Sequence, residues 1–289
     1  MRAKDTLGEW ARMRELERFG VGNFSDEEIV EKTTYIRSLM EGRAVPAHPS
    51  ISVVLPAHNE AKYILATLRS LAEQTYQNCE FIIVSNGEPK DNQTERLALM
   101  SGFRVIHDPI GGISRARQTG LEAARGEIVV TTDADTVHHS RWIERISEIM
   151  SDRNIPCGAG LWRSNSPLAS VRLIFAWIAL THRVKSVLNP KFVTGVSEAA
   201  SFYRRELAIA AGGYDPSVKL SEGLMMYRKM RKPGVPIIFT DEELVITTSG
   251  RRQESQGAFR WFWLGFWNAG LQLLGKKGVS EEAYPHHIR

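Results

Sequence analysis

The chain has 289 residues, of which 43% are hydrophobic and 24% are charged. This is the composition of a globular protein with one large domain or one domain plus extensions, and it excludes disordered, collagen-like and coiled-coil proteins. The 37 lysines and arginines outnumber the 33 acidic residues, which gives a net charge of +4. This excess permits contact with phosphates or an anionic membrane surface, but it is too small to indicate a nucleic-acid-binding protein.

Cysteine usage and hydropathy indicate the compartment. Cys79 and Cys157 lack the spacing of a zinc site or a disulfide framework, which suits a reducing environment. The first ten residues lack the apolar core of a signal peptide, and no uninterrupted apolar stretch is long enough to span a bilayer. We therefore expect a cytoplasmic protein, and leave open whether it lies peripherally on the inner face of the cell membrane.

Residues 1–50 are expected to form a helical extension. One helix is expected at residues 7–19, and a second opens at Ser25, whose spacing to Glu28 is that of a capping box. The sequence leaves open whether the extension docks on the following domain, mediates pairing of two chains or holds a partner.

From residue 51 onward, buried-type strands alternate with amphipathic helices. The pattern predicts strands at residues 51–57, 81–85, 103–106 and 127–135, and helices at residues 62–74, 92–100, 114–124 and 139–150. This alternation indicates an α/β protein with a mostly parallel sheet flanked by helices. Ligands of such folds bind beyond the carboxyl ends of the strands, and the strings PAHNE, SNGEPKDN and DAD each stand at such an end.

The second half of the chain is less regular. We expect a helix at residues 170–188, a turn or strand feeding a helix at 194–207, a tight turn at 212–214, a short helix at 224–231, strands at 236–240 and 244–249, and an aromatic-rich helix at 261–274.

Asp133 and Asp135 carry the first chemical hypothesis. Residues two apart at the end of a strand point the same way, so both carboxylates could bind one cation. Mg²⁺ or Mn²⁺ takes a few carboxylate oxygens and completes its coordination with substrate phosphates and water. The alternative is a pair of solvated carboxylates in a turn, but the buried run EIVVTT before them favours a ligand-facing edge.

Two further turns bear on the kind of ligand. PAHNE stands where a dinucleotide-binding fold would carry a G-x-G-x-x-G turn, and this disfavours a nicotinamide dehydrogenase. After Gly112 a helix opens with Arg115 and Arg117, and a helix N-terminus with arginines can bind an anion. An ordinary basic surface helix is the alternative.

Together the strings PAHNE, SNGEPKDNQT, GGISRARQTGLEAARGEIVVTTDADT and GVSEAASFYRRELAIAAGGYDP resemble, in order and spacing, the family 2 glycosyltransferases. These are inverting nucleotide-sugar enzymes of the GT-A fold, and the resemblance runs from about Ile51 to Trp261. It implies a GT-A type, mostly parallel nucleotide-binding sheet with an acceptor-side subregion. The chain then divides into an extension (1–50), a glycosyltransferase domain (51–255, with a nucleotide-sugar half at 51–136 and an acceptor half at 137–255), and an aromatic amphipathic helix with tail (256–289).

The resemblance also implies which residues bind the donor. The nucleotide-sugar set is Pro56, Ala57, Asn59, Glu60, Asn86, Arg117, Asp133 and Arg251. Family members usually carry an Asp near position 86 to read a pyrimidine base, and Asn86 can still hydrogen-bond a uracil edge. Asp133 would face the ribose or the sugar, and with catalytic Asp135 it would hold a Mg²⁺ or Mn²⁺ ion at the diphosphate. Arg251 would neutralise the leaving diphosphate, or would simply cover the sheet edge.

The catalytic base follows from a looser match to the family. Its Glu-Asp motif has Leu three and Arg six residues after the Asp, and LSEGLMMYRKMRKPG places Ser221 and Glu222 at the motif with Met225 and Arg228 at the offsets. A Glu can take the proton of an acceptor hydroxyl as an Asp does. A register shifted by one residue would put Gly223 there and leave no base.

Two apolar segments bear on the acceptor. Residues 173–180 (LIFAWIAL) lie between basic residues, and residues 260–267 (RWFWLGFW) hold three tryptophans. Such helices tend to lie in a bilayer interface, although burial against the domain or a partner subunit is the alternative. The Gln-x-x-Arg-Trp string of processive members is only partly matched, at Arg260 and Trp261.

The sequence thus predicts a metal-dependent inverting glycosyltransferase of hexosyltransferase type. It would move a sugar from a nucleoside diphosphate donor, expected to be a UDP-sugar, to a hydroxyl of a glycan, a lipid-linked acceptor or a protein, in polysaccharide or glycolipid synthesis. One alternative is a non-catalytic nucleotide-sugar binder or regulatory partner, which Asn86 and the pair Ser221 and Glu222 would favour. The other is a nucleotidyltransferase, whose glycine-rich basic loop after the first strand is missing from PAHNEAKY.

Overall fold

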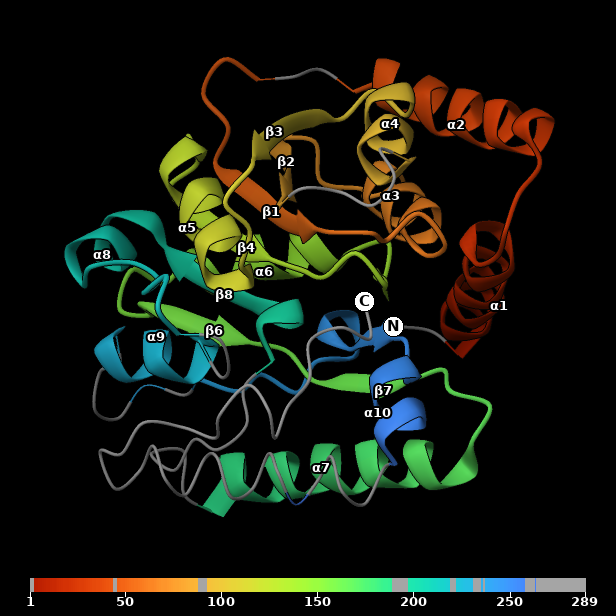
Figure 1. Ribbon diagram of the computed structural model, residues 1–289. Coiled ribbons are helices and arrows are strands. Elements are labelled where there is room, and N and C mark those ends of the chain that lie inside the picture. Colours follow the sequence, from red (N-terminus) through yellow and green to blue (C-terminus); the bar gives the residue numbers. More distant parts are fainter. Residues whose placement is uncertain are drawn as a thin grey trace.

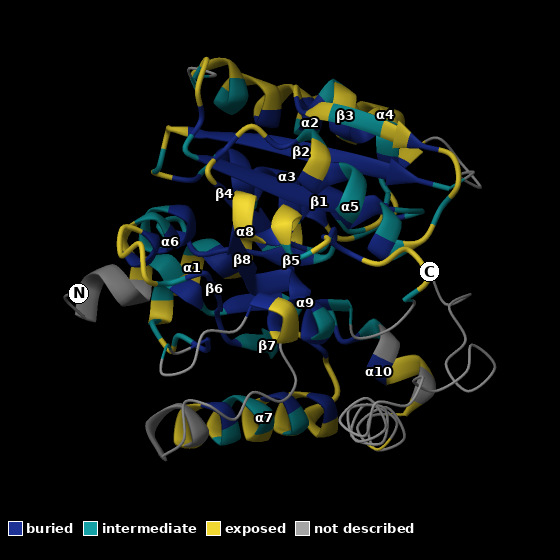
Figure 2. Cartoon of the chain, turned by 90° about the vertical axis from the view of Figure 1, so that its left-hand side faces the viewer, coloured by how far each residue is buried: buried dark blue, intermediate teal, exposed yellow. Residues whose placement is uncertain are grey.

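The computed structural model of the chain describes residues 3–43, 46–87, 93–188, 197–218, 222–230, 235, 237–257 and 263. Within these residues, a central sheet of six strands carries helices on both faces, and a smaller sheet of three strands lies beside it (Figure 1). Helix α7 (Ala169–Leu188) runs along the smaller sheet, away from the central one (Figures 1 and 2). The predicted α/β class is confirmed.

The central sheet consists of β1 (Ile51–Ala57), β2 (Cys79–Asn86), β3 (Arg104–Asp108), β4 (Ile128–Thr131), β6 (Cys157–Ala159) and β8 (Ser201–Arg204). The spatial order is β3-β2-β1-β4-β8-β6. The first four strands run parallel to one another, whereas β8 is antiparallel to β4 and to β6. The sheet is therefore mostly parallel, as predicted, and the second half of the chain completes it.

Each face of the central sheet packs on its own set of helices. One face carries α3 (Ile64–Ala72), α4 (Gln93–Met100) and α6 (Trp142–Met150), and the other carries α5 (Ile113–Ala123), α8 (Arg205–Ala210) and α9 (Glu222–Met230). Strand β1 belongs to both cores, because Val53 and Leu55 lie in the first and Val54 in the second. This follows from the alternation of side chains along a strand, and it explains why β1 is apolar throughout.

Helix α5 lies very close to β1. A Cβ atom on Gly120 would stand 2.1 Å from Cγ1 of Val54, so a larger residue would push the helix off the strand. Gly112 is the N-cap residue of α5, with φ of 101°, a conformation that glycine adopts without strain. These two glycines therefore fix where α5 begins and how near it comes to the sheet.

The N-terminal extension docks on the domain. Helices α1 (Ala3–Gly20) and α2 (Asp26–Glu41) pack against α3, and α2 also contacts α4. The predicted capping box is present, since the Glu28 amide donates to Ser25 Oγ at 3.3 Å and the Ser25 amide donates to Glu28 Oε2 at 2.8 Å. Arg12 Nε donates to Glu73 at 2.8 Å and ties α1 to the end of α3. Of the three roles left open for the extension, docking is the one that the structure shows.

The predicted strand at residues 127–135 is too long. Strand β4 ends at Thr131, and the chain leaves the sheet in a turn that contains both Asp133 and Asp135. It then forms β5 (Thr136–Val137) in the smaller sheet, whose order is β5-β9-β7. Asp133 pairs with Arg117 of α5, whereas Asp135 pairs with Arg251 of α10. In an extended strand both side chains would point to the same side, so the strand ends before them.

The other errors concern short elements. Residues 236–240 were expected as a strand, but in the described part of this range Ile238 makes only an isolated bridge to Ala159. The pattern did not predict β6, β7 (Trp162–Ser164) or α10 (Arg251–Gln256), and β9 (Ile246–Thr248) is shorter than expected. Elements of three to six residues are too short to show a hydrophobic period. The helix expected at 261–274 lies outside the described residues, except for Trp263.

The remaining predicted elements are confirmed with small shifts at their ends. In the part of the chain that the structure describes, no helix combines the length and the apolar character needed to cross a bilayer. Cys79 and Cys157 are both buried and free.

Glu80 is a buried carboxylate that links β2 to β1 and to the loop after α5. Its Oε1 accepts hydrogen bonds from Ser52 Oγ at 2.7 Å and from the Arg125 amide at 2.8 Å, and its Oε2 accepts one from Arg125 Nε at 3.0 Å. Burial by itself raises the pKa of Glu80, but the hydrogen bonds from Ser52 and Arg125 outweigh it, so the pKa lies below its ordinary value of 4.5. The ionised form of Glu80 therefore stabilises the fold.

We predict that Glu80→Gln lowers the free energy of unfolding at neutral pH by about 1.5–3 kcal/mol, because hydrogen bonds to a charged group are lost. The contribution of Glu80 is complete above the unfolded pKa near 4.5 and is lost as pH falls through the lower folded pKa. The variant should therefore lose less stability than the parent on acidification, which urea unfolding at neutral and acid pH measures. Glu122→Gln, at an exposed position of α5, is the control. Equal acid sensitivity of parent and Glu80→Gln would contradict this assignment.

Candidate active site

The sequence-predicted residues gather where the parallel strands end. The loops after β1 and β4 lie at the carboxyl edge of the sheet beside the end of β2, and the N-termini of α5 and α9 and the start of α10 meet them there (Figure 1). This is the edge at which α/β folds bind ligands. Pro56 and Ala57 close β1 and pair in register with Val84 and Ser85 of β2.

The PAHNE loop is held by hydrogen bonds to β2. His58 Nδ1 donates to the backbone oxygen of Asn86 at 2.6 Å, and this fixes the tautomer in which Nε2 accepts from Asn59 Nδ2 at 2.8 Å. Asn59 has φ of 56°, in the left-handed region that Asn tolerates better than most residues. The Glu60 amide donates to Thr94 Oγ1 of α4 at 2.8 Å. The loop is thus shaped by its own polar residues.

The buried side chain of Asn86 joins three segments. Oriented to satisfy its neighbours, its amide donates to the Ala57 carbonyl at 3.0 Å and accepts from the Gly112 amide at 3.2 Å. Asn86 therefore ties the ends of β1 and β2 to the turn before α5. Reading of a base by this residue stays a prediction.

Arg117 on α5 forms the centre of a first charged cluster. Its guanidinium is buried, with 3% of the side chain exposed, and its Nη2 donates to Asp133 at 2.7 Å. Its Nη1 pairs with Glu222, the first residue of α9, and its Nε lies 3.9 Å from Glu198. Burial alone would lower the pKa of Arg117, but Glu222, Asp133 and Glu198 together raise it above its ordinary value. Three carboxylates from separate segments thus share one guanidinium.

Glu198 is the most deeply buried carboxylate of this cluster. It stands in the short helix η1 (Glu198–Ala200) and accepts hydrogen bonds from the hydroxyls of Tyr203 and of Tyr214, the latter at 2.7 Å, and from Thr131 Oγ1 at 3.0 Å. Burial raises the pKa of Glu198 above its ordinary value and outweighs the opposing effect of Arg117 and the two tyrosines. Its charge is therefore costly, and Arg117 is the cation that compensates it.

A second charged cluster surrounds Arg251 at the start of α10. Arg251 Nη2 donates to Glu60 at 2.6 Å, its Nε lies 3.4 Å from Asp135, and its guanidinium stands 4.5 Å from the centre of the Tyr63 ring. Asp135 also accepts hydrogen bonds from Ser249 Oγ and, at 3.3 Å, from Thr248 Oγ1.

An open pocket of about 230 Å³ lies beside the second cluster. Its lining includes Tyr63, Asp135 and Arg251, together with Glu17 from the N-terminal extension and Asn165 from the segment before α7. The extension therefore contributes a carboxylate to the wall of the candidate site.

The two aspartates of the DAD turn do not share a partner. Asp133 faces Arg117 with 39% of its side chain exposed, whereas Asp135 faces Arg251 with 13% exposed. Across the described ranges, no three His, Cys, Asp or Glu side chains gather closely enough to hold a metal ion. The carboxylates can thus supply part of a Mg²⁺ or Mn²⁺ coordination shell, and phosphates and water would supply the rest.

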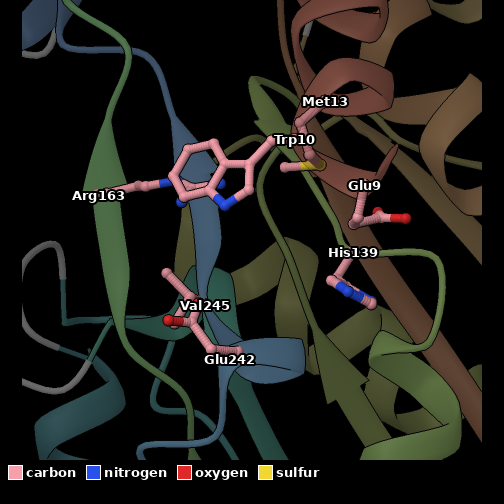
Figure 3. Close-up of a pocket in the computed structure, with 7 residues that line it drawn as sticks. All are labelled: Glu9, Trp10, Met13, His139, Arg163, Glu242 and Val245. Atoms are coloured by element: carbon pink, nitrogen blue, oxygen red, sulfur yellow. The ribbon is translucent and has the colours of Figure 1, made fainter. Parts of the chain in front are cut away.

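A small cavity between α1 and the smaller sheet is separate from this site (Figure 3). Glu9, Trp10, His139 and Arg163 are among its lining residues, and the Trp10 ring lies 3.9 Å from the Arg163 guanidinium. Its volume of about 20 Å³ has room for about one water molecule. The cavity is a packing gap under the docked extension.

Sequence reasoning missed two carboxylates that shape the site. Glu198 stands within the recognised string GVSEAASFY, but its role depends on tyrosines that only the fold brings to it. Asp108 at the end of β3 accepts hydrogen bonds from Arg115 Nε at 3.0 Å and from Thr119 Oγ1 at 2.8 Å, and so orients α5. A position at the end of a predicted strand was the signal that could have indicated Asp108. The predicted residues Ser221, Arg260 and Trp261 lie outside the described residues.

Comparison with known proteins gives a family and a fold. The sequence profile described as Glycosyl transferase family 2 matches residues 52–210, more than half of the chain. EpsJ of Bacillus subtilis (strain 168), an uncharacterized glycosyltransferase, is 28% identical over 189 residues, which cover 60% of this chain and 54% of EpsJ. Glycosyltransferase GlyG of Streptococcus pneumoniae serotype 4 is 31% identical over 108 residues, which cover 36% of each chain. The match thus spans about half of EpsJ and about a third of GlyG.

Solved structures share the fold at low sequence identity. Mannosyltransferase PcManGT of Pyrobaculum calidifontis, in complex with GDP-Man and Mn²⁺, gives a TM-score of 0.58 at 16% identity and covers 90% of this chain and 75% of its own. Glucosyl-3-phosphoglycerate synthase of Mycobacterium tuberculosis, in complex with Mn²⁺, UDP-Glc and phosphoglyceric acid, gives 0.51 at 20% identity, with 86% and 85% covered. S. aureus TarS 1-349 with UDP-GlcNAc gives 0.52 at 17% identity, with 76% and 67% covered. The predicted GT-A type of fold is confirmed.

We predict that Glu198→Gln makes the stability of the fold less dependent on pH. Because the folded pKa of Glu198 is raised, its contribution to stability is complete below the unfolded pKa near 4.5 and is lost as pH rises through the folded pKa. Glutamine keeps the shape of the side chain and cannot ionise, so this loss should be absent from the variant. Chemical unfolding at a series of pH values from 4.5 to neutrality measures it, with Glu206→Gln on the exposed side of α8 as control. The same pH slope in parent and Glu198→Gln would rule out a raised pKa.

Proposed function

The chain belongs to glycosyltransferase family 2, and on this premise we propose that it is a metal-dependent, inverting glycosyltransferase. It moves a sugar from a nucleoside diphosphate donor to a hydroxyl of a glycan, a lipid-linked acceptor or a protein. The solved relatives in complex with UDP-GlcNAc, GDP-Man and UDP-Glc support a donor of this class. Among these nucleotides we favour a uridine nucleotide, because the Asn86 side-chain amide keeps a second N–H and a second oxygen lone pair for a uracil edge besides its bonds to Ala57 and Gly112.

The observation that carries this proposal is the pairing of Arg117 with both Asp133 and Glu222. Glu222 is 89 positions from Asp133 in the sequence, yet one buried guanidinium joins them. A donor-side carboxylate and the expected base thus flank one cation at the ligand-binding edge of the sheet. This supports the register in which Glu222, and not Gly223, stands at the base position, since a Cβ atom on Gly223 would collide with Glu198.

Asp135, with Asp133, is the proposed holder of a Mg²⁺ or Mn²⁺ ion. Carboxylate oxygens are the hard ligands that these ions prefer, and the structures of PcManGT and glucosyl-3-phosphoglycerate synthase with Mn²⁺ support such a site. The ion would neutralise charge on the departing diphosphate. Arg251 lies against the same Asp135 carboxylate and would contribute a second positive charge there.

The proposed reaction is a single displacement at the anomeric carbon. The acceptor hydroxyl oxygen attacks that carbon from the face opposite the diphosphate, the new carbon–oxygen bond forms, and the bond to the diphosphate oxygen breaks with its electron pair. The proton of the hydroxyl passes to the Glu222 carboxylate. The ion pair with Arg117 holds the Glu222 carboxylate in position, and 13% of the Glu222 side chain is exposed. In this scheme residues 51–136 supply the donor side together with Arg251, and the rest of residues 137–255 supplies the acceptor side.

We predict that one nucleoside diphosphate, expected to be UDP, raises the unfolding temperature of the protein only when Mn²⁺ or Mg²⁺ is present. A ligand at a hundredfold excess over its dissociation constant stabilises by about 2.7 kcal/mol. Asp135→Ala should lose the metal-dependent part, whereas Asp152→Ala, on an exposed turn, should keep it. A thermal-shift titration with UDP and GDP measures both. Stabilisation without metal, or an unchanged response of Asp135→Ala, would refute the metal site.

We predict that Glu222→Ala lowers the rate of sugar transfer at least about a hundredfold, which is the usual contribution of a general base. Its affinity for the donor should change little, because Arg117 keeps its contact with Asp133. Turnover of a radiolabelled sugar nucleotide and donor binding by calorimetry separate the two effects, and Glu122→Gln is the control. Full activity in Glu222→Ala would disprove its role as base. Donor binding without any transfer in the parent would favour the non-catalytic alternative.

A further inference from the structure

Helix α7 has an apolar face that packs on the protein. Val171, Phe175 and His182 are buried, and the His182 ring lies 5.5 Å from the ring of Trp162 on β7. These contacts explain why the helix forms and why it lies along the smaller sheet. They use only one side of it.

The opposite side of α7 is also apolar. Leu173, Trp177, Leu180 and Val184 have 69%, 54%, 58% and 47% of their surface exposed. Their spacing of four, three and four residues places them in one line along the helix, about 16 Å long at 1.5 Å per residue. We refer to these four residues as the α7 face. Figure 2 shows exposed patches along α7, at the end of the molecule farthest from β3.

The charged residues within α7 are all basic. The helix sequence contains Arg172, Arg183 and Lys185 and has no Asp or Glu. Arg172 and Arg183 are exposed and stand eleven residues apart, which places them along the same edge of the face. Arg172 Nη1 donates to the backbone oxygens of Ser166 and Pro167, so its guanidinium is fixed at the start of the helix.

We propose that the α7 face binds an anionic lipid surface. Leucine, valine and tryptophan enter the boundary between headgroups and acyl chains, and flanking arginines bind anionic headgroups. A second copy of the chain fits less well, because two α7 faces packed together by a twofold axis would bring basic edges against each other without a carboxylate between them. An acidic protein surface would attract Arg172 and Arg183 but would leave the apolar side chains of Leu173 and Leu180 exposed to water.

The position of α7 links this surface to the candidate site. Asn165 and Pro167, just before α7, line the pocket that also contains Asp135 and Arg251. A membrane on the α7 face would therefore lie next to the segment that forms the pocket wall. For the acceptor, which rests on the proposed function, this favours a lipid-linked hydroxyl.

Cosedimentation of the full chain with vesicles tests the proposal without any need for transfer activity. The parent should bind vesicles of phosphatidylcholine mixed with phosphatidylglycerol, should bind pure phosphatidylcholine weakly, and should be released by salt. Combined Leu173→Gln, Trp177→Gln and Leu180→Gln should weaken binding at least about tenfold through lost apolar contact. Arg183→Gln should weaken it about fivefold.

Matched controls separate the α7 face from general effects. Combined Val30→Gln, Leu99→Gln and Leu207→Gln alters three similarly exposed apolar residues on other helices, and Arg153→Gln alters a basic residue with 85% exposure. Both should bind like the parent, and circular dichroism should show that all variants fold. Absence of parent binding to anionic vesicles, or equal binding by the α7 triple variant, would overturn the proposal. So would a parent dimer in sedimentation velocity that the triple variant abolishes, because a second copy would then occupy the α7 face.

Discussion

The buried guanidinium of Arg117 is the interaction on which the candidate site depends. Asp133, Glu198 and Glu222 come from three segments that are distant in sequence, and each contacts this one cation. A buried carboxylate without a cation is costly, so the loop after β4, helix η1 and helix α9 are held around α5 by the same charge. The position of Arg117 in turn depends on Gly120, which lets α5 pack directly on β1. A packing constraint in the core thereby sets the geometry of the charged edge.

The two aspartates of the DAD turn contact different clusters. Asp135 lies against Arg251 and accepts hydrogen bonds from Ser249 and Thr248, whereas Asp133 accepts one from Arg117. Arginines neutralise both carboxylates, and each arginine comes from a different part of the chain. Binding of a metal ion and a diphosphate would therefore redistribute ion pairs that already exist. This is why Arg251 belongs to the candidate site even though it stands after the last strand of the fold.

The regions outside the sheet also bear on the site. The N-terminal extension docks on α3 and contributes Glu17 to the pocket beside Asp135. Helix α7 packs on β7 with one apolar side and exposes a second. Both elements lie outside the central sheet. The N-terminal extension nevertheless forms part of the pocket wall, and α7 begins next to that wall.

The sequence by itself determined the alternation of strands and helices, the mostly parallel sheet, the edge at which the polar strings gather, and the family. These properties depend on local patterns, because hydrophobic period, capping spacing and turn residues act over a few positions. The tertiary structure decided which carboxylate faces which arginine, that Asp133 and Asp135 diverge, and that Glu198 and Asp108 join the site. A strand of three residues is too short to show a hydrophobic period in the sequence. An ion pair between residues as distant as Glu60 and Arg251 produces no sequence pattern either. Their energy comes from burial and charge compensation, which exist only once the chain is folded.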